Sequence, residues 1–88
     1  MRAASTVKAS NPVKKSIHSA KQQKLSALLA QGREDAGLTQ TQVAKKLGKP
    51  QSFIAKYEGG ERRLDVIELL EICKIIGMNF RDVLDEIK

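Results

Sequence analysis

The sequence is poor in the residues on which several protein classes depend. Among its 88 residues there is no tryptophan, one tyrosine, two phenylalanines, two prolines, one cysteine and one histidine. Cys73 cannot form an internal disulfide, which fits a reducing cytoplasm, and the apolar helical pattern around it predicts a buried structural thiol rather than a nucleophile. His18 has neither a second histidine nor a pair of cysteines to join it, so the sequence predicts no metal site.

Signatures of membrane insertion, secretion and catalysis are also missing. No apolar run reaches the roughly 18 residues that a membrane-spanning helix needs. The N-terminal stretch lacks an apolar segment followed by a small-residue cleavage site, so we expect no secretory signal. There is no glycine-rich phosphate loop and no set of serine, histidine and acid beyond the lone histidine. We therefore expect neither an enzyme nor a cofactor.

Aliphatic side chains must supply most of the stability. Apolar residues make up 41% of the chain but aromatic residues only 3%. A chain of this length is near the lower limit for a self-supporting core, so we expect one small domain.

Positive charge is unevenly distributed along the chain. The net charge is +6, and residues 1–24 contain basic side chains but no acidic ones. Basic side chains gather around the middle of the chain, at Lys45, Lys46, Lys49, Lys56, Arg62 and Arg63. Acidic side chains dominate after Leu64, so the domain is polarised. One basic face predicts contact with a polyanion, and ordinary solvated charge is the alternative interpretation.

Residues 1–18 show no helical or alternating period and contain the break Asn11-Pro12. We predict a disordered basic arm, which either follows phosphates beside the domain or has no role. The domain itself is expected over residues 19–88.

Hydrophobic spacing predicts five helices in that domain, which is therefore all-α. The first covers Ser19 to Ala36, with Leu25, Leu28, Leu29 and Gly32 on one face. The second and third cover Gln40 to Leu47 and Pro50 to Glu58. The fourth starts at Asp65 and ends at Gly77, with an inner stripe of Val66, Leu69, Leu70, Cys73 and Ile76. The fifth is capped by Asn79, with Phe80, Val83, Leu84 and Ile87 facing inward.

Residues 39–58 form the stretch around which the other helices are arranged. Thr39 and Gln42 have the spacing of a capping box, Gly48 suits a turn with positive φ, and Pro50 suits the start of the next helix. Ile54 and Tyr57 of that helix face the core, whereas Gln51, Ser52 and Lys56 lie on the opposite face. An amide, a hydroxyl and an ammonium there match the hydrogen-bonding edges of bases in a major groove.

These spacings resemble the lambda-repressor-like, Cro/Xre-type helix-turn-helix family over about two-thirds of the chain, from Leu25 to Leu84. The resemblance is carried by Gln40 at the start of the unit, Ala44 where its helices touch, the turn at Gly48, and the inward Ile54 and Tyr57. It continues through the exit Glu58-Gly59-Gly60-Glu61-Arg62-Arg63 and the two closing helices.

The resemblance implies a role for each matching position. Base contacts are expected from Gln51, Ser52, Lys56 and Pro50, with Gln51 the best candidate for a bidentate contact to adenine. Phosphate contacts are expected from Gln40, Thr39, Lys49, Arg62 and Arg63, and Gln40 should also brace the recognition helix. Arg33 and Glu58 match a structural ion pair of the family. A prokaryotic, cytoplasmic and nucleoid-associated protein is implied.

Three positions depart from the family pattern. Phe53 replaces a small or polar residue, and it could pack on a sugar–phosphate edge, extend the core or meet a partner. Gly32 replaces a large apolar residue and should permit close approach of another helix. Leu64 stands where a proline is common, so the exit loop is expected to be looser.

The closing helices have more apolar surface than one small core needs. We predict a homodimer contact through Ile67, Ile75 and Ile87, with scattered surface aliphatics as the alternative. The function predicted is a sequence-specific double-stranded DNA-binding regulator, a small repressor or controller that inserts the helix at 50–58 in the major groove of a near-palindromic site. The alternative is an antitoxin-like or adaptor module that uses the same fold to bind a protein partner.

Overall fold

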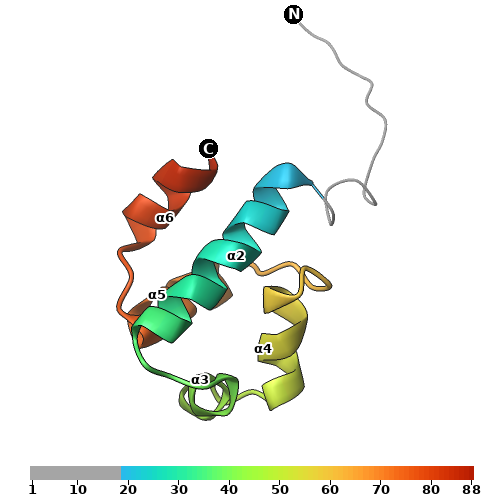
Figure 1. Cartoon of the computed structure of the whole chain (residues 1–88), viewed down its shortest axis with the longest axis vertical. Helices are drawn as coiled ribbons and strands as arrows, with labels where there is room; N and C mark the ends of the chain where they lie inside the picture. The colour runs from blue at the N-terminus through green and yellow to red at the C-terminus, as the bar shows by residue number, and fades with distance from the viewer. Residues whose placement is uncertain (1–18) are drawn as a thin grey trace, which may run out of the picture.

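The computed structural model describes residues 19–88, and the arm predicted over residues 1–18, with His18, lies outside the described residues. Within that range the chain forms five α-helices and no strand (Figure 1). The helices are α2 (Ala20–Asp35), α3 (Gln40–Leu47), α4 (Gln51–Glu58), α5 (Val66–Ile76) and α6 (Phe80–Ile87). The predicted all-α, five-helix architecture is confirmed.

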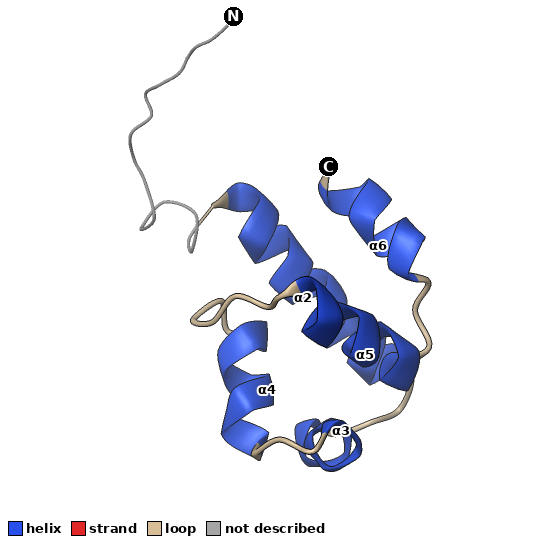
Figure 2. Ribbon diagram, turned by 180° about the vertical axis from the view of Figure 1, so that it is seen from behind, coloured by secondary structure: helices blue, strands red, loops and turns tan. Residues whose placement is uncertain are grey.

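The helices α3 and α4 lie at one end of the domain, and α6 lies beside the first half of α2 at the other (Figures 1 and 2). The ion pair between Lys24 Nζ and Glu86 Oε1, 3.9 Å long, joins α2 to α6. Helix α5 packs against α2, α3 and α6 at once. None of the helices between residues 19 and 88 is long and apolar enough to cross a membrane.

Local capping explains where most helices begin. The Thr39 hydroxyl accepts a hydrogen bond from the Gln42 N–H at 3.1 Å, and the Gln42 side chain accepts one from the Thr39 N–H at 2.8 Å. Asp65 and Glu68 form the same reciprocal box at the start of α5. These contacts satisfy backbone donors that have no partner inside the helix. Pro50 is the N-cap of α4 rather than its first helical residue, so α4 begins one position later than predicted.

The core is mostly aliphatic and lies between the helices. Its buried apolar residues are Leu25, Leu29, Val43, Ala44, Phe53, Ile54, Tyr57, Leu69, Ile72, Cys73, Ile76 and Val83. Burial also raises the pKa of the Cys73 thiol, which disfavours the reactive thiolate and fits a structural role.

The predicted inner stripe of α5 needs correction at two positions, and α6 at one. Val66 is 66% exposed although it was expected inside, and Ile72 is fully buried although it was left off the stripe. Val66 is the first residue of α5, where side chains lean back beyond the helix end and away from the core. Ile72 is buried because it lies on one helical face with the other buried residues of α5, and together they form the set Leu69, Ile72, Cys73 and Ile76 with the spacing i, i+3, i+4 and i+7. Leu84, also expected inside, is 39% exposed.

Gly32 permits a close approach, as predicted, by Ile76 at the end of helix α5 and also by Met78 in the turn between α5 and α6. A Cβ at this position would overlap the Met78 sulfur and lie 3.1 Å from Ile76 Cδ1. The missing side chain therefore lets this turn close against α2.

Candidate nucleic-acid interface

The turn between α3 and α4 places α4 with one face outward. Gly48 ends α3 in the left-handed conformation, with φ +73°. The Lys49 N–H then bonds to the Ala44 carbonyl at 3.0 Å, which satisfies the end of α3 and redirects the chain. On α4, Ile54 and Tyr57 are buried in the core.

The opposite face of α4 is polar and open to solvent. Gln51, Ser52 and Lys56 are exposed, and the N-cap Pro50 beside them is exposed too. Ala55, half-buried, lies between Ser52 and Lys56 and adds only a methyl group to this face. The structure thus brings together on one surface all four residues that were expected to contact bases.

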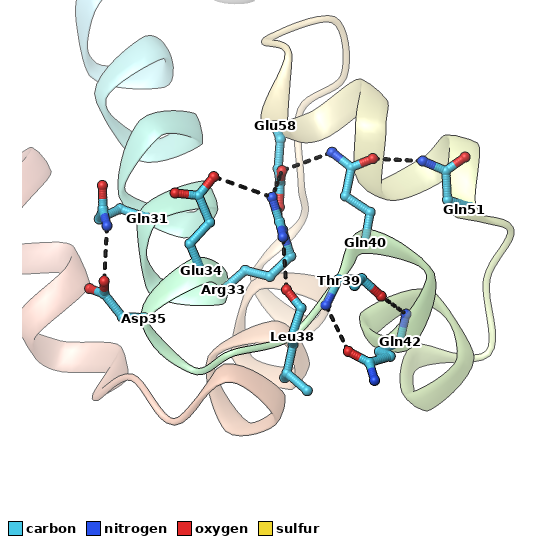
Figure 3. Close-up of polar contacts among 10 residues, drawn as sticks. All are labelled: Gln31, Arg33, Glu34, Asp35, Leu38, Thr39, Gln40, Gln42, Gln51 and Glu58. Carbon is cyan, nitrogen blue, oxygen red and sulfur yellow. Dashed lines mark hydrogen bonds and ion pairs between the residues drawn. The ribbon is translucent and has the colours of Figure 1, made fainter.

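A chain of four polar side chains crosses from α2 to this face (Figure 3). Arg33 on α2 donates two hydrogen bonds to the Glu58 carboxylate, from Nε at 2.8 Å and from Nη2 at 3.2 Å. Gln40 Nε2 donates to Glu58 Oε1 at 3.0 Å, and Gln51 Nε2 donates to Gln40 Oε1 at 2.6 Å. Gln40 therefore bridges the end of α4 to its start.

The inner half of this chain is shielded from water. The side chains of Arg33 and Glu58 are 13% and 6% exposed. The pKa of Arg33 is raised above its ordinary value, chiefly by the hydrogen bond to Glu58, although burial acts in the opposite direction. Arg33 Nη1 also donates to the Leu38 carbonyl at 2.8 Å, which ties the α2–α3 connection to the end of α4.

Phe53 extends the core, which was one of the three placements that the sequence left open. It is 9% exposed and packs edge-on against Tyr57, with ring centroids 5.8 Å apart. Two cations lie over its ring, with Arg62 Cζ 4.4 Å and Lys49 Nζ 5.4 Å from the ring centroid. The aromatic ring therefore supports basic side chains at the edge of the α4 surface through cation–π contacts.

Arg62 is held by the protein itself. It donates to both carboxylate oxygens of Glu68, at 3.1 and 3.2 Å, and to the Arg63 carbonyl at 2.6 Å. The pKa of Glu68 is lowered, first by the hydrogen bond from the Asp65 N–H and then by Arg62. Arg62 was expected on a phosphate; in this geometry a phosphate would have to compete with Glu68 for its guanidinium.

Two arginines neutralise two of the acids near α4, because Glu58 pairs with Arg33 and Glu68 with Arg62. The basic side chains exposed around α4 are Lys45, Lys46, Lys49, Lys56 and Arg63, and the exposed acids among them are Glu61 and Asp65. The two ion pairs leave the net charge unchanged, and the exposed side chains around α4 are predominantly basic, which suits a polyanion.

Comparisons with known proteins agree with this geometry. The model of the helix-turn-helix family HTH_3 matches residues 29–83. An XRE-family-like protein from Pseudomonas syringae pv. tomato str. DC3000 is 44% identical and superposes with a TM-score of 0.75 over 88% of this chain and 94% of that one. The chain belongs to the Cro/Xre-type helix-turn-helix family.

More distant structures share the fold. The clp gene regulator ClgR from Corynebacterium glutamicum is 26% identical, with a TM-score of 0.70 over 75% of this chain and 70% of that one. The restriction-modification controller protein C.AhdI from Aeromonas hydrophila is 23% identical, with a TM-score of 0.67 over 73% of this chain and 97% of that one, and shows the fold alone. No curated protein sequence matches this chain. Membership of this family makes the protein a DNA-binding transcriptional regulator and not an enzyme.

The residues expected at a dimer contact do not share one environment. Ile67 is 65% exposed, whereas Ile75 and Ile87 are partly buried against the core. The sequence missed Val66, which lies next to Ile67 and is equally exposed. Two adjacent exposed β-branched residues at the start of α5 are the strongest apolar surface feature of the described domain.

The sequence also missed the partner of Arg62. Glu68 is the third residue of α5, where it forms the capping box with Asp65. The spacing of six residues between Arg62 and Glu68 gives no helical signal, because a loop separates them.

Proposed function

We propose that this regulator reads a specific DNA sequence by placing α4 in the major groove. Gln51, Ser52 and Lys56, with Pro50 beside them, would approach base edges, and Gln51 would make a bidentate contact to adenine. The observation that carries the proposal is the exposed amide of Gln51 at the start of α4, held by Gln40 at 2.6 Å rather than left to rotate in solvent. A polar group with a defined hydrogen-bond partner on an outward helix is suited to base readout.

Phosphates on either side of the groove would be held by Lys49 and Arg63, by Thr39 and Gln40 at the start of α3, and by Arg62 where it can exchange Glu68 for a phosphate. Backbone N–H groups at the start of α3 would add contacts that do not depend on sequence. Each phosphate contact releases counterions, so it steepens the dependence of affinity on salt by roughly one unit of log–log slope.

We infer further that the protein works as a homodimer on a near-palindromic operator of a prokaryotic nucleoid and represses by occupying it. Ile67, with Val66 beside it, is the exposed part of the proposed contact, and Ile75 and Ile87 would support it from the core. A two-fold dimer would place two α4 helices about 34 Å apart, one turn of DNA. Sedimentation should show a dimer at micromolar concentration that Ile67→Lys converts to monomer. A wild-type protein that stays monomeric with and without DNA would refute this part.

Base readout can be tested by selecting bound duplexes from a random pool and measuring affinity for the selected site and for variants of it. Gln51→Ala should lose the preference between sequences while it keeps the salt dependence of nonspecific binding. The matched control is Gln31→Ala, because Gln31 is an exposed glutamine that is also hydrogen-bonded, to Asp35 at 2.9 Å, but lies on α2 away from α4 (Figure 3). Equal binding to all duplexes by the wild-type protein, or none, would refute sequence-specific readout and favour a protein-binding role.

A further inference from the structure

We infer that Glu58 is a positioning residue that decides which base Gln51 reads, although it lies too deep to touch DNA itself. The inference rests on the proposed function and adds to it a direction of hydrogen bonding that runs from Glu58 through Gln40 to Gln51 (Figure 3). It concerns which end of the Gln51 amide points outward.

The buried carboxylate of Glu58 sets the direction of the hydrogen bonds. An ionised carboxylate only accepts hydrogen bonds. The Glu58 side chain is 6% exposed and is held in place by its ion pair with Arg33. Gln40 can therefore bond to Glu58 only through its NH₂ group, as it does at 3.0 Å. An amide whose NH₂ points at Glu58 must present its carbonyl oxygen on the other side.

Gln40 constrains the Gln51 side chain at the surface in the same way. Gln40 Oε1 only accepts, so Gln51 must offer it an N–H, and the structure has that bond at 2.6 Å. One N–H of Gln51 is then occupied, which leaves its carbonyl oxygen and its second N–H for DNA. Because each link admits one orientation, the orientation of both amides follows from the carboxylate rather than from an arbitrary choice of amide flip.

An oxygen acceptor beside an N–H donor complements adenine. Adenine presents an N6–H donor and an N7 acceptor in the major groove, whereas guanine presents two acceptors, N7 and O6. A Gln51 amide turned the other way would present two N–H donors and would suit guanine. The buried charge of Glu58 thus selects adenine over guanine at the position that Gln51 faces.

The experiment reverses the direction without touching Gln51. Gln40→Lys places an ammonium between Glu58 and Gln51, and an ammonium only donates, so Gln51 must turn its oxygen inward and both N–H groups outward. Gln40→Met removes the link but leaves the ion pair of Arg33 and Glu58 intact. The base position to be varied is the one at which Gln51→Ala abolishes preference in the selected duplex.

The measurement is the ratio of affinities for two duplexes that differ only by adenine or guanine at that position, at one fixed salt concentration. A ratio is used because the added charge of Gln40→Lys strengthens binding to any duplex equally. The wild-type protein should favour adenine by roughly 5- to 150-fold, the usual discrimination of a bidentate pair. Gln40→Met should bring the ratio close to one, and Gln40→Lys should favour guanine. A thermal melt of each variant checks that it is folded.

The outcomes separate the two levels of the proposal. If Gln51→Ala leaves base preference unchanged at every position, the proposed function fails. If Gln51→Ala abolishes the preference but both Gln40 variants keep the wild-type ratio, the proposed function stands and the role of Glu58 is overturned. If both Gln40 variants lose the preference and Gln40→Lys does not favour guanine, Gln40 only holds Gln51 in place. That result would also overturn the inference that Glu58 sets the orientation of the Gln51 amide.

Discussion

Replacing Arg33 by methionine should be the most damaging single change to a charged residue of the domain. Arg33→Met removes two hydrogen bonds to Glu58 and one to the Leu38 carbonyl. The Glu58 carboxylate, 6% exposed, would remain buried with only the Gln40 amide as a partner. Leaving one member of a buried pair without its counter-charge typically costs about 3–5 kcal/mol. A small domain has a total free energy of unfolding of only about 5–15 kcal/mol, so the variant should be close to unfolding.

The assay is urea unfolding followed by far-UV circular dichroism, because guanidinium is itself a salt and would screen the ion pair. With a slope of about 1 kcal/mol per molar urea for a small domain, the midpoint should fall by roughly 3 M or more. The matched control is Asp85→Asn, which breaks the pair of Asp85 and Lys88, whose side chains are 67% and 79% exposed. Exposed pairs contribute at most about 1 kcal/mol, so this variant should unfold near the wild-type midpoint.

A double variant distinguishes the loss of the attraction between Arg33 and Glu58 from the cost of leaving Glu58 buried without a counter-charge. Arg33→Met with Glu58→Met removes both charges, and such replacements are often neutral or stabilising. The double variant should therefore be more stable than Arg33→Met alone. If Arg33→Met costs no more than Asp85→Asn, or if the double variant is less stable than the single one, the account of this ion pair is wrong.

Three further measurements test other parts of the structure. Gly48→Ala forces a Cβ into the left-handed region at φ +73°, so it should destabilise the domain by about 1 kcal/mol and lower the melting temperature by roughly 4–8 °C, whereas a rise would show that the turn relaxes freely. The lowered pKa of Glu68 means that its stabilisation is complete above the ordinary carboxyl value of 4.5 and is lost as pH falls through the lower folded value. Glu68→Gln should therefore flatten the loss of stability in that acid range, and an unchanged pH profile would count against the contacts with Asp65 and Arg62. The Cys73 thiol should react with a thiol reagent only at the rate of unfolding, and fast reaction of the native protein would contradict its burial.

Helix boundaries could be predicted from the sequence because the signals for them are local. Thr39 with Gln42, and Asp65 with Glu68, are pairs three residues apart whose side chains reach each other in any helix that starts there. The left-handed turn at Gly48 is local in the same sense. Burial could not be predicted as well, because it depends on neighbours from distant parts of the chain. Val66 has the helical spacing of the buried face of α5, three residues before Leu69, and yet it is 66% exposed.

Some features of the candidate site could likewise be predicted from local sequence signals, and others could not. The outward position of Gln51, Ser52 and Lys56 follows from helical periodicity once the inward side of α4 is known. The pairing of Arg62 with Glu68 depends instead on how the loop at 59–65 folds back, and no periodicity governs a loop. The cations above Phe53 come from both ends of α4, so their meeting over one ring is visible only in three dimensions.

The position of Glu58 connects stability with readout. It is the last residue of α4, where the helix dipole disfavours a negative charge by about 0.3–1 kcal/mol, and it is buried as well. Arg33 offsets these costs, but two apolar residues would serve the fold equally well. What they could not do is force the amide of Gln40, and through it that of Gln51, into one orientation. The double variant without either charge should therefore fold stably and still bind DNA, yet choose between adenine and guanine less well than the wild-type protein. A double variant that kept the full preference would show that the orientation of Gln51 is fixed by DNA alone and not by the domain.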